Sequence, residues 1–225
     1  MDLREALYTT RAMRRLKPDP IPMDVQARIL DAAIRAPNIG QAWRFILVDD
    51  REVIGRIAPI YEAAFEKLLG GYGLSIEDML RDEGAMGSAA RSGIHLARNF
   101  GGVPLILVAF GKAGMASGVH PAVWSAMLAA RAEGIGSTWT GVLQSFFADE
   151  LNEILGVPSG EEWTCYGVVP MGYPVGRWGV APRAPVHTVA ARNSWTGELG
   201  FTVDEPLWKP GDGDGAARAT GEGRV

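Results

Sequence analysis

The chain has 225 residues, of which 47% are hydrophobic and 21% charged, and its formal net charge is −4. This composition is typical of a globular protein, and a pI near 5.5 argues against a nucleic-acid platform or a polybasic membrane binder. Apolar runs fall short of the roughly 20 residues that span a bilayer, and the charged N-terminus lacks a signal-peptide core. We therefore expect a cytoplasmic protein with neither a nucleic-acid nor a membrane partner.

The apolar and turn-forming residues predict an alternation of helices and strands. In chain order these are helices over 3–8 and 22–34, a strand over 44–49, helices over 51–57 and 60–69, a strand over 103–110, a helix from Pro121 that ends at Gly134–Gly136, a strand over 137–142, a helix over 148–155 and a strand over 163–171. The segment 103–110 is apolar on both faces, which predicts a central strand in a sheet covered on both sides. The mixture indicates an α+β or α/β sandwich.

Residues 59–99 follow these patterns less clearly, because glycines interrupt them repeatedly. Glycine-punctuated segments suit lids, so we interpret this region either as an insertion that covers a pocket or as a plain helical excursion. No linker divides the rest of the chain, which predicts one domain over residues 1–208. Residues 209–225 have low complexity and are expected to form a disordered tail.

Cys165 is the only cysteine, which excludes an internal disulfide and a cysteine-rich zinc or iron–sulfur site. It lies in an apolar, strand-like stretch, so we interpret it as a packing residue. His95, His120 and His187 are isolated and lack the spacing of metal ligands. We therefore predict no metal site.

Three arginines, Arg11, Arg14 and Arg15, lie close together just ahead of a proline-rich stretch. The guanidinium group can donate two parallel hydrogen bonds to phosphate oxygens, so this cluster in an acidic chain indicates an anion site. A solvated, basic end to the first helix is the alternative. The sequence has no P-loop, no Gly-x-Gly-x-x-Gly, no His-Glu-x-x-His and no Gly-x-Ser-x-Gly, so an enzyme whose cofactor carries the reaction fits it better than a hydrolase.

Four segments, in the right order, resemble the motifs of the FMN-dependent nitroreductases. They are Thr10-Arg11-Ala12-Met13-Arg14-Arg15-Leu16 followed by Pro20-Ile21-Pro22, the loop Ala36-Pro37-Asn38-Ile39-Gly40-Gln41-Ala42-Trp43-Arg44-Phe45, the segment from Leu128 to Trp139 with Gly134-Ile135-Gly136, and Met171-Gly172-Tyr173-Pro174 with Arg183 after it. Thr10 and Ala12 depart from the family's arginine and serine, and the loop 36–43 is shortened. Arg15 is a candidate to replace the outer phosphate contact.

The resemblance implies an α+β, three-layer sandwich in which helices flank a central, mainly antiparallel sheet, and a domain-intertwined homodimer with cofactor sites built across the dimer. It implies that Arg11 pairs with the FMN phosphate, that Arg14 lies at the pyrimidine edge of the flavin as an electrostatic stabiliser, and that the backbone of 134–136 lies against the isoalloxazine. Asn38 and Gln41 would reach the cofactor of the neighbouring subunit. The remaining residues expected at the cofactor are Ala12, Met13, Arg15, Trp43, Gly134, Ile135, Gly136 and Arg183.

The activity implied by the resemblance is electron transfer from NADH or NADPH, through bound FMN, to an electron-poor small molecule of the nitroaromatic or quinone type. Such enzymes work by a ping-pong mechanism, and no side chain is expected to act as a catalytic acid or base. Two alternatives stay open. One is a different flavin reaction on the same fold, namely flavin fragmentation, dehalogenation or ring dehydrogenation. The other is a non-catalytic flavin-binding protein.

Overall fold

The computed structural model describes residues 1–211, except for the side chains of Ala85, Met86 and Ser88. It divides them into two compact units. The larger unit comprises residues 11–177, and the smaller one comprises residues 1–10 together with the chain from Trp178 onward. Most of the predicted tail, from residue 212 to the end, lies outside the described residues.

A four-stranded sheet forms the centre of the larger unit. Its strands are β1 (Trp43–Val48), β2 (Leu105–Lys112), β3 (Gly136–Ser137) and β4 (Trp163–Gly172). The strand order is β1-β2-β4-β3, and every neighbouring pair is antiparallel. β2 is central and buried along almost its whole length, which confirms the prediction made from its apolar character on both faces.

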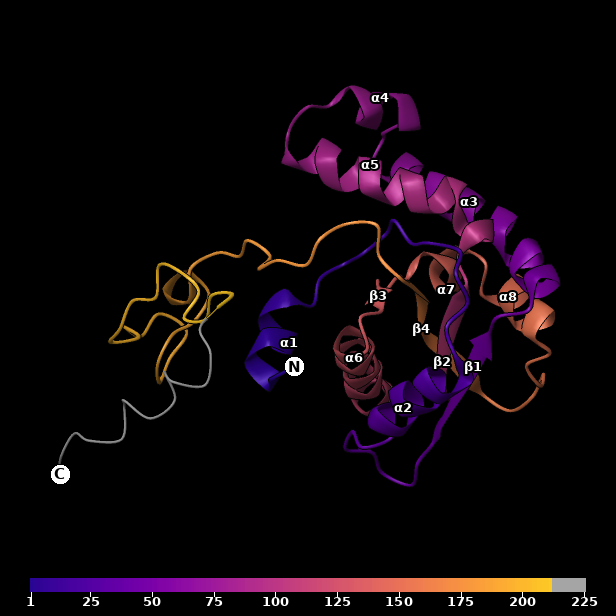
Figure 1. The fold of residues 1–225 in the computed structure, drawn as a ribbon, viewed down its shortest axis with the longest axis horizontal. Coiled ribbons are helices and arrows are strands. Elements are labelled where there is room, and N and C mark those ends of the chain that lie inside the picture. The colour runs from indigo at the N-terminus through magenta and orange to yellow at the C-terminus, as the bar shows by residue number, and fades with distance from the viewer. Residues whose placement is uncertain (212–225) are drawn as a thin grey trace. The chain divides into compact units, whose positions relative to one another are not determined.

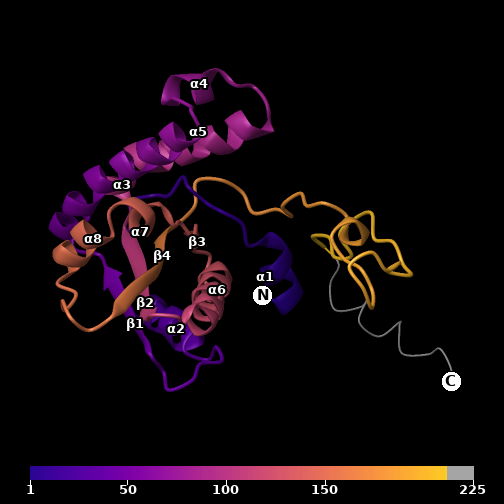
Figure 2. The same ribbon diagram turned by 180° about the vertical axis from the view of Figure 1, so that it is seen from behind.

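Helices cover both faces of this sheet. They are α2 (Met23–Ala33), α3 (Arg51–Gly71), α4 (Ile76–Arg81), α5 (Ala85–Arg98), η1 (Phe100–Gly102), α6 (Ala116–Ala132), α7 (Val142–Phe146) and α8 (Ala148–Leu155). Figure 1 and the reverse view in Figure 2 show α2 and α6 on one face, and α3, α7 and α8 on the other. The expected three-layer α+β arrangement is therefore confirmed.

The core consists of two apolar clusters, one on each face of the sheet. Ile106, Val108 and Phe110 of β2 point into the cluster that includes α3, α5, α7 and α8. The alternate residues of β2, such as Leu107, point into the cluster that includes α2 and α6. This alternation follows from the two-residue period of a strand, and it explains why β2 needs apolar residues at every position.

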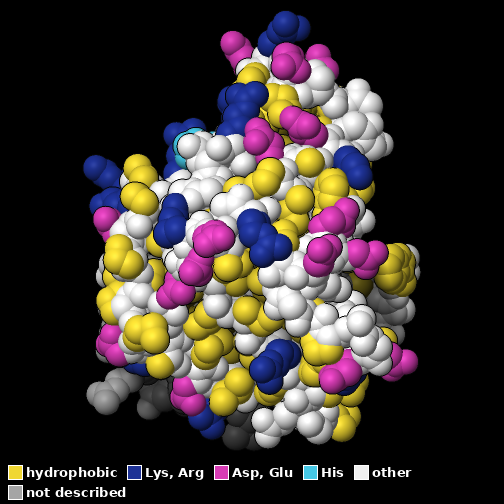
Figure 3. Space-filling view, turned by 90° about the vertical axis from the view of Figure 1, so that its right-hand side faces the viewer, with side chains coloured by type: hydrophobic (Ala, Val, Ile, Leu, Met, Phe, Trp, Pro, Cys, Tyr) yellow, Lys and Arg dark blue, Asp and Glu magenta, His cyan; other side chains and the backbone are white. Residues whose placement is uncertain are grey.

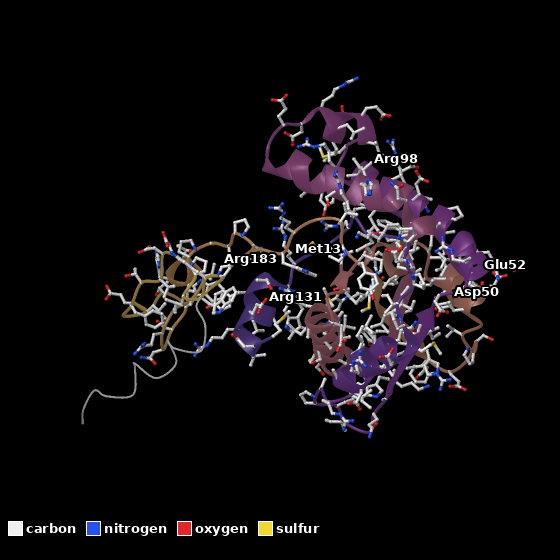
Figure 4. All side chains as sticks on the ribbon, in the orientation of Figure 1. Met13, Asp50, Glu52, Arg98, Arg131 and Arg183 are labelled. Atoms are coloured by element: carbon white, nitrogen blue, oxygen red, sulfur yellow. The ribbon has the colours of Figure 1, made fainter. Side chains whose placement is uncertain are left out.

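Helix α3 is longer than predicted, because it continues through Pro59 without a break. Asp50 begins it as an N-cap, accepting hydrogen bonds from the amides of Glu52 (2.8 Å) and Val53 (3.0 Å); Asp50 and Glu52 are labelled in Figure 4. A proline inside a helix removes one main-chain hydrogen bond. The helix nevertheless continues, because its buried face, which includes Tyr61, packs onto the sheet.

Two further boundaries differ from the predictions. Helix α6 begins at Ala116, ahead of Pro121. The carbonyl of Met115 accepts hydrogen bonds from the amides of Gly118 and Val119, and these bonds extend the helix upstream of the proline. The predicted strand over 137–142 is wrong beyond its first residue. Thr140 makes an isolated bridge to Val168, after which the chain turns into α7.

The smaller unit contains helix α1 (Leu3–Thr9) and the short η2 (Val186–Thr188), and its remaining described residues are irregular. Tyr8 packs against the buried Trp208, with ring centroids 5.8 Å apart. A cavity of about 500 Å³ lies between α1 and the segments around 180–186 and 203–207.

The surface carries charges of both signs. On the face shown in Figure 3, Lys and Arg side chains are interspersed with Asp and Glu, and apolar side chains lie between them. Among residues 1–211, no helix has the length and apolar character that crossing a bilayer requires.

Cys165 lies in β4 and is 7% exposed, in agreement with its interpretation as a packing residue. Burial raises the pKa of its thiol to about 11, so the reactive thiolate is scarce at neutral pH. We expect a thiol reagent such as dithionitrobenzoate to label the native protein at least about 100-fold more slowly than the urea-unfolded chain. Because the chain has one cysteine, the released chromophore counts this site alone, and equal labelling rates would contradict its burial.

Candidate functional site

Residues 11–17, which we call the arginine strap, run along the β3 edge of the sheet. The amide of Met13, labelled in Figure 4, donates to the carbonyl of Ser137 at 2.9 Å. The amide of Lys17 donates a hydrogen bond to the carbonyl of Tyr173 at 2.8 Å, and the amide of Val175 donates one to the carbonyl of Arg15 at 3.0 Å. These bonds bring together three of the four sequence motifs, namely the strap, the Gly134–Gly136 segment and the Met171–Pro174 turn.

Gly136 allows this close approach. A Cβ atom on Gly136 would lie 2.9 Å from Cβ of Met13, 3.1 Å from Cβ of Pro174 and 3.3 Å from Cδ2 of Leu16. These distances are shorter than ordinary van der Waals contacts, so a side chain there would push the strap away from the sheet.

The two residues before Gly136 have structural roles of their own. Gly134 has φ +76° directly after α6, and this left-handed conformation ends the helix. Ile135 is fully buried among the residues of α2 and α6. The predicted contact of the 134–136 backbone with a flavin stays a prediction.

The guanidinium groups of the strap have no carboxylate partner in the larger unit. Arg14 is half-buried, whereas Arg11 and Arg15 are exposed. Among the described side chains of residues 11–177, none forms an ion pair or a hydrogen bond with these three arginines. Arg28 in α2 differs from these arginines, because its guanidinium group forms ion pairs with Glu133 and Asp24, each at 2.9 Å. Unneutralised guanidinium groups in one segment favour the anion-site interpretation.

Arg14 lines a cavity of about 680 Å³ beside the β3 edge. The sheet side of its wall is the segment from Thr138 to Val142, which follows the Gly-Ile-Gly motif. The opposite side comes from α3, α4 and α5, mainly through apolar and aromatic side chains such as Phe65 and Leu68. The region 59–99 therefore forms much of the wall of the cavity that contains Arg14. Whether it moves as a lid stays a prediction.

The cavity also contains hydroxyl groups that the sequence did not identify. The Tyr61 hydroxyl donates to Oγ1 of Thr140 at 3.3 Å, and Thr138 is buried beside it in the wall. Burial raises the pKa of Tyr61, while Thr140 and the positive charge of Arg14 act in the opposite direction. Thr138 lies inside the motif Leu128–Trp139 and Thr140 directly follows it, which was a usable signal. Tyr61 lies in the region 59–99, which contains no recognised motif, so no pattern in the sequence signalled its role.

Asn38, Gln41 and Trp43 lie at the opposite edge of the sheet, before and within β1. Oδ1 of Asn38 accepts a hydrogen bond from the amide of Ala42 at 3.1 Å, which closes a turn in which Gly40 and Gln41 both have positive φ. Trp43 is half-buried and packs against Phe45. Since β2 and β4 separate β1 from β3, one chain does not bring these residues to its own arginine strap.

Arg183 belongs to the smaller unit. Its side chain is exposed, and Nη1 donates to the carbonyl of Pro182 at 2.9 Å. Its predicted closure on a phosphate stays a prediction.

Comparison with known proteins identifies the fold and the family of this chain. A protein of Methanothermobacter thermautotrophicus, provisionally named NADH dehydrogenase/NAD(P)H nitroreductase, is 23% identical over 186 residues, covering 77% of this chain and 78% of that protein. A crystal structure of iodotyrosine deiodinase bound to FMN and 3-iodo-L-tyrosine superposes with a TM-score of 0.64 at 21% identity, covering 81% of this chain and 95% of that one. A Bacteroides fragilis nitroreductase with bound FMN gives a TM-score of 0.58 at 19% identity, covering 91% of this chain and 100% of that one. The model of the nitroreductase family matches residues 7–173. The chain therefore belongs to the nitroreductase family.

Proposed function

We propose that this protein is an FMN-dependent oxidoreductase that passes electrons from NADH or NADPH to an electron-poor small molecule, such as a nitroaromatic or a quinone, in two half-reactions. Family membership and the name of the archaeal relative support an oxidoreductase. The observation that carries the proposal is the set of guanidinium groups on the strap that have no partner among the described side chains of residues 11–177, with Arg14 in the wall of a large cavity. A cytoplasmic location, expected from the composition, is part of the same proposal.

The residues present fit FMN. A phosphate group needs cations, and Arg11 and Arg15 offer exposed guanidinium groups with no partner in the larger unit. A tricyclic ring needs an apolar slot with a few polar groups, and the volume of about 680 Å³ lies within the range of small-molecule pockets. When bound, FMN would accept a hydride from the nicotinamide and supply electrons to the acceptor.

The side chains of this chain would then have separate tasks. Arg11 and Arg15 would hold the phosphate, and Arg14 would place positive charge near the ring, where it favours electron-rich states. The main chain of Ala12, Met13 and 134–136 would define the slot. The aromatic and apolar wall from α3 and α5 would exclude water from the reacting groups.

We propose further that the protein acts as a homodimer. Asn38, Gln41 and Trp43 lie on the edge of the sheet opposite the strap, so in this proposal they serve the cofactor of the partner subunit. Arg183 would complete the phosphate site. Two solved nitroreductase-fold neighbours contain FMN, which supports the cofactor but leaves the dimer as a proposal.

A second candidate is reductive dehalogenation of an aromatic substrate. It is favoured by the structural similarity to an iodotyrosine deiodinase, which superposes with a TM-score of 0.64. It uses the same cofactor and the same cavity, so it differs from the main proposal only in the acceptor.

The decisive experiment reconstitutes the purified protein with FMN and measures each half-reaction separately without oxygen. We expect a yellow holoprotein whose flavin absorbance is bleached by NADH or NADPH and restored by a quinone or a nitroaromatic. Release of iodide from iodotyrosine would select the second candidate. A protein that takes up no FMN at saturating concentration would contradict both, and FMN binding without NAD(P)H oxidation would indicate the non-catalytic alternative.

A further inference from the structure

Tyr61 is held rigidly at the wall of the candidate site. It comes from the buried face of α3, is 3% exposed, and stacks on Phe100 with ring centroids 4.0 Å apart and an angle of 21° between the rings. The stacked ring fixes the direction of the hydroxyl group, which reaches Oγ1 of Thr140 at 3.3 Å. The hydroxyl hydrogen can still rotate from Thr140 to another acceptor.

Two other groups share the cavity wall with this hydroxyl, namely Thr140 and Arg14. Thr140 is held by a pair of main-chain hydrogen bonds to Val168, of 2.9 and 3.2 Å. Arg14 comes from the strap, lines the same cavity, and acts electrostatically on Tyr61. A phenol beside a hydroxyl and a cation therefore lies on one wall, although the three residues come from three separate parts of the chain.

Few other groups in this wall can release a proton. Among the described side chains that line the cavity there is no carboxyl, imidazole, thiol or ammonium group. Tyr72 also lines it but is 74% exposed, and Thr138 and Thr140 are much weaker acids. Because burial raises the pKa of Tyr61, its phenol is protonated near neutral pH. The positive charge of Arg14 would stabilise the phenolate that remains after proton release.

We propose that Tyr61 is the proton donor to the electron acceptor, with Thr140 as its positioning residue. This inference rests on the proposed function, because it concerns the second half-reaction. A quinone takes up a hydride, which brings one electron pair and one hydrogen, and needs one proton more. The Tyr61 O–H bond breaks as the new O–H bond forms on the quinone oxygen, and the phenolate then regains a proton from water. The balance is NAD(P)H plus H⁺ plus quinone giving NAD(P)⁺ plus hydroquinone.

The test uses Tyr61→Phe in the FMN-loaded protein, because phenylalanine keeps the stacked ring and removes only the hydroxyl. We expect FMN affinity and the rate of bleaching by NADH to stay unchanged, and reoxidation by benzoquinone to slow by about 10- to 100-fold, at the lower end of general-acid effects. Ferricyanide accepts one electron at a time and takes no proton, so its rate of reoxidation should be the same in the variant and the wild type.

Three further variants separate a chemical role from a structural one. Thr140→Val should lower the ratio of the quinone rate to the ferricyanide rate, and Thr140→Ser should restore it. Tyr166→Phe is the matched control, because it loses the same hydroxyl group from a tyrosine whose hydroxyl donates to the carbonyl of Lys112 at 3.1 Å. Tyr166 is not part of the cavity wall, so all its rates should match the wild type.

The possible failures are distinguishable. If Tyr61→Phe reacts with benzoquinone at the wild-type rate, the inference is overturned and the proposed function stands. If the variant loses the quinone and ferricyanide rates equally, Tyr61 has only a structural role and the inference is again overturned. If the wild type itself takes up no FMN or is not bleached by NAD(P)H, the proposed function fails and this inference falls with it.

Discussion

Replacing Gly136 by valine is expected to lower the free energy of unfolding by about 3 kcal/mol, at the upper end of overpacking costs. The new side chain would meet the Cβ atoms of Met13 and Pro174, whose distances from a Cβ at this position are 2.9 and 3.1 Å. Both neighbours are held by main-chain pairing, so they cannot give way without loosening the arginine strap. Urea unfolding of the cofactor-free protein measures this change. The affinity for FMN should fall in parallel, since the strap carries the proposed phosphate ligands.

Gly55→Ala is the matched control for this prediction. Gly55 is an exposed residue in α3, and no atom lies within 4 Å of a Cβ built there. Alanine is the better helix former, so this variant should be more stable by roughly 0.5–1 kcal/mol. FMN affinity should not change. A Gly136→Val protein with the unfolding midpoint of the wild type would show that the strap does not pack against β3 as described.

Replacing Arg11 or Arg14 by glutamine is expected to raise the dissociation constant of FMN by about 10- to 100-fold each, the effect of losing one hydrogen bond to a charged group. Both arginines are on the strap and lack a carboxylate partner in the larger unit, so glutamine breaks no ion pair there. Fluorescence titration of the cofactor-free protein with FMN measures the change.

Riboflavin separates the two arginines, because it has the ring system but no phosphate. Arg11→Gln should leave riboflavin affinity unchanged, whereas Arg14→Gln should weaken the binding of both ligands. Arg35→Gln is the control. Arg35 is exposed in the turn that follows α2 and pairs with Asp31, so its loss should change neither affinity. Equal FMN affinities for the wild type and both strap variants would remove the strap from the cofactor site.

The sequence by itself determined the elements whose signals are local. Helix α8 lies over the predicted residues, and β2 and β4 lie within one or two residues of their predicted bounds. Apolar runs and helical spacing are properties of neighbouring residues, so they can be read without knowing the fold. The arginine cluster and the Gly-Ile-Gly segment were found in the same way, because each is a short pattern of residue types.

Only the tertiary structure decided how these patterns combine. The contact of Met13 with Ser137 joins two segments from opposite halves of the chain, and no local pattern specifies that pairing. The same holds for Tyr61 and Thr140, which come from α3 and the β3 edge and meet in one cavity. Helix α3 continues through Pro59 because packing of its buried face outweighs a local helix-breaking signal. Local propensities differ by about 1 kcal/mol or less for most residues and by about 3 kcal/mol for a proline inside a helix. Burial of each large side chain contributes about 1.5–3 kcal/mol, and α3 buries several, so long-range packing outweighs the local signal there.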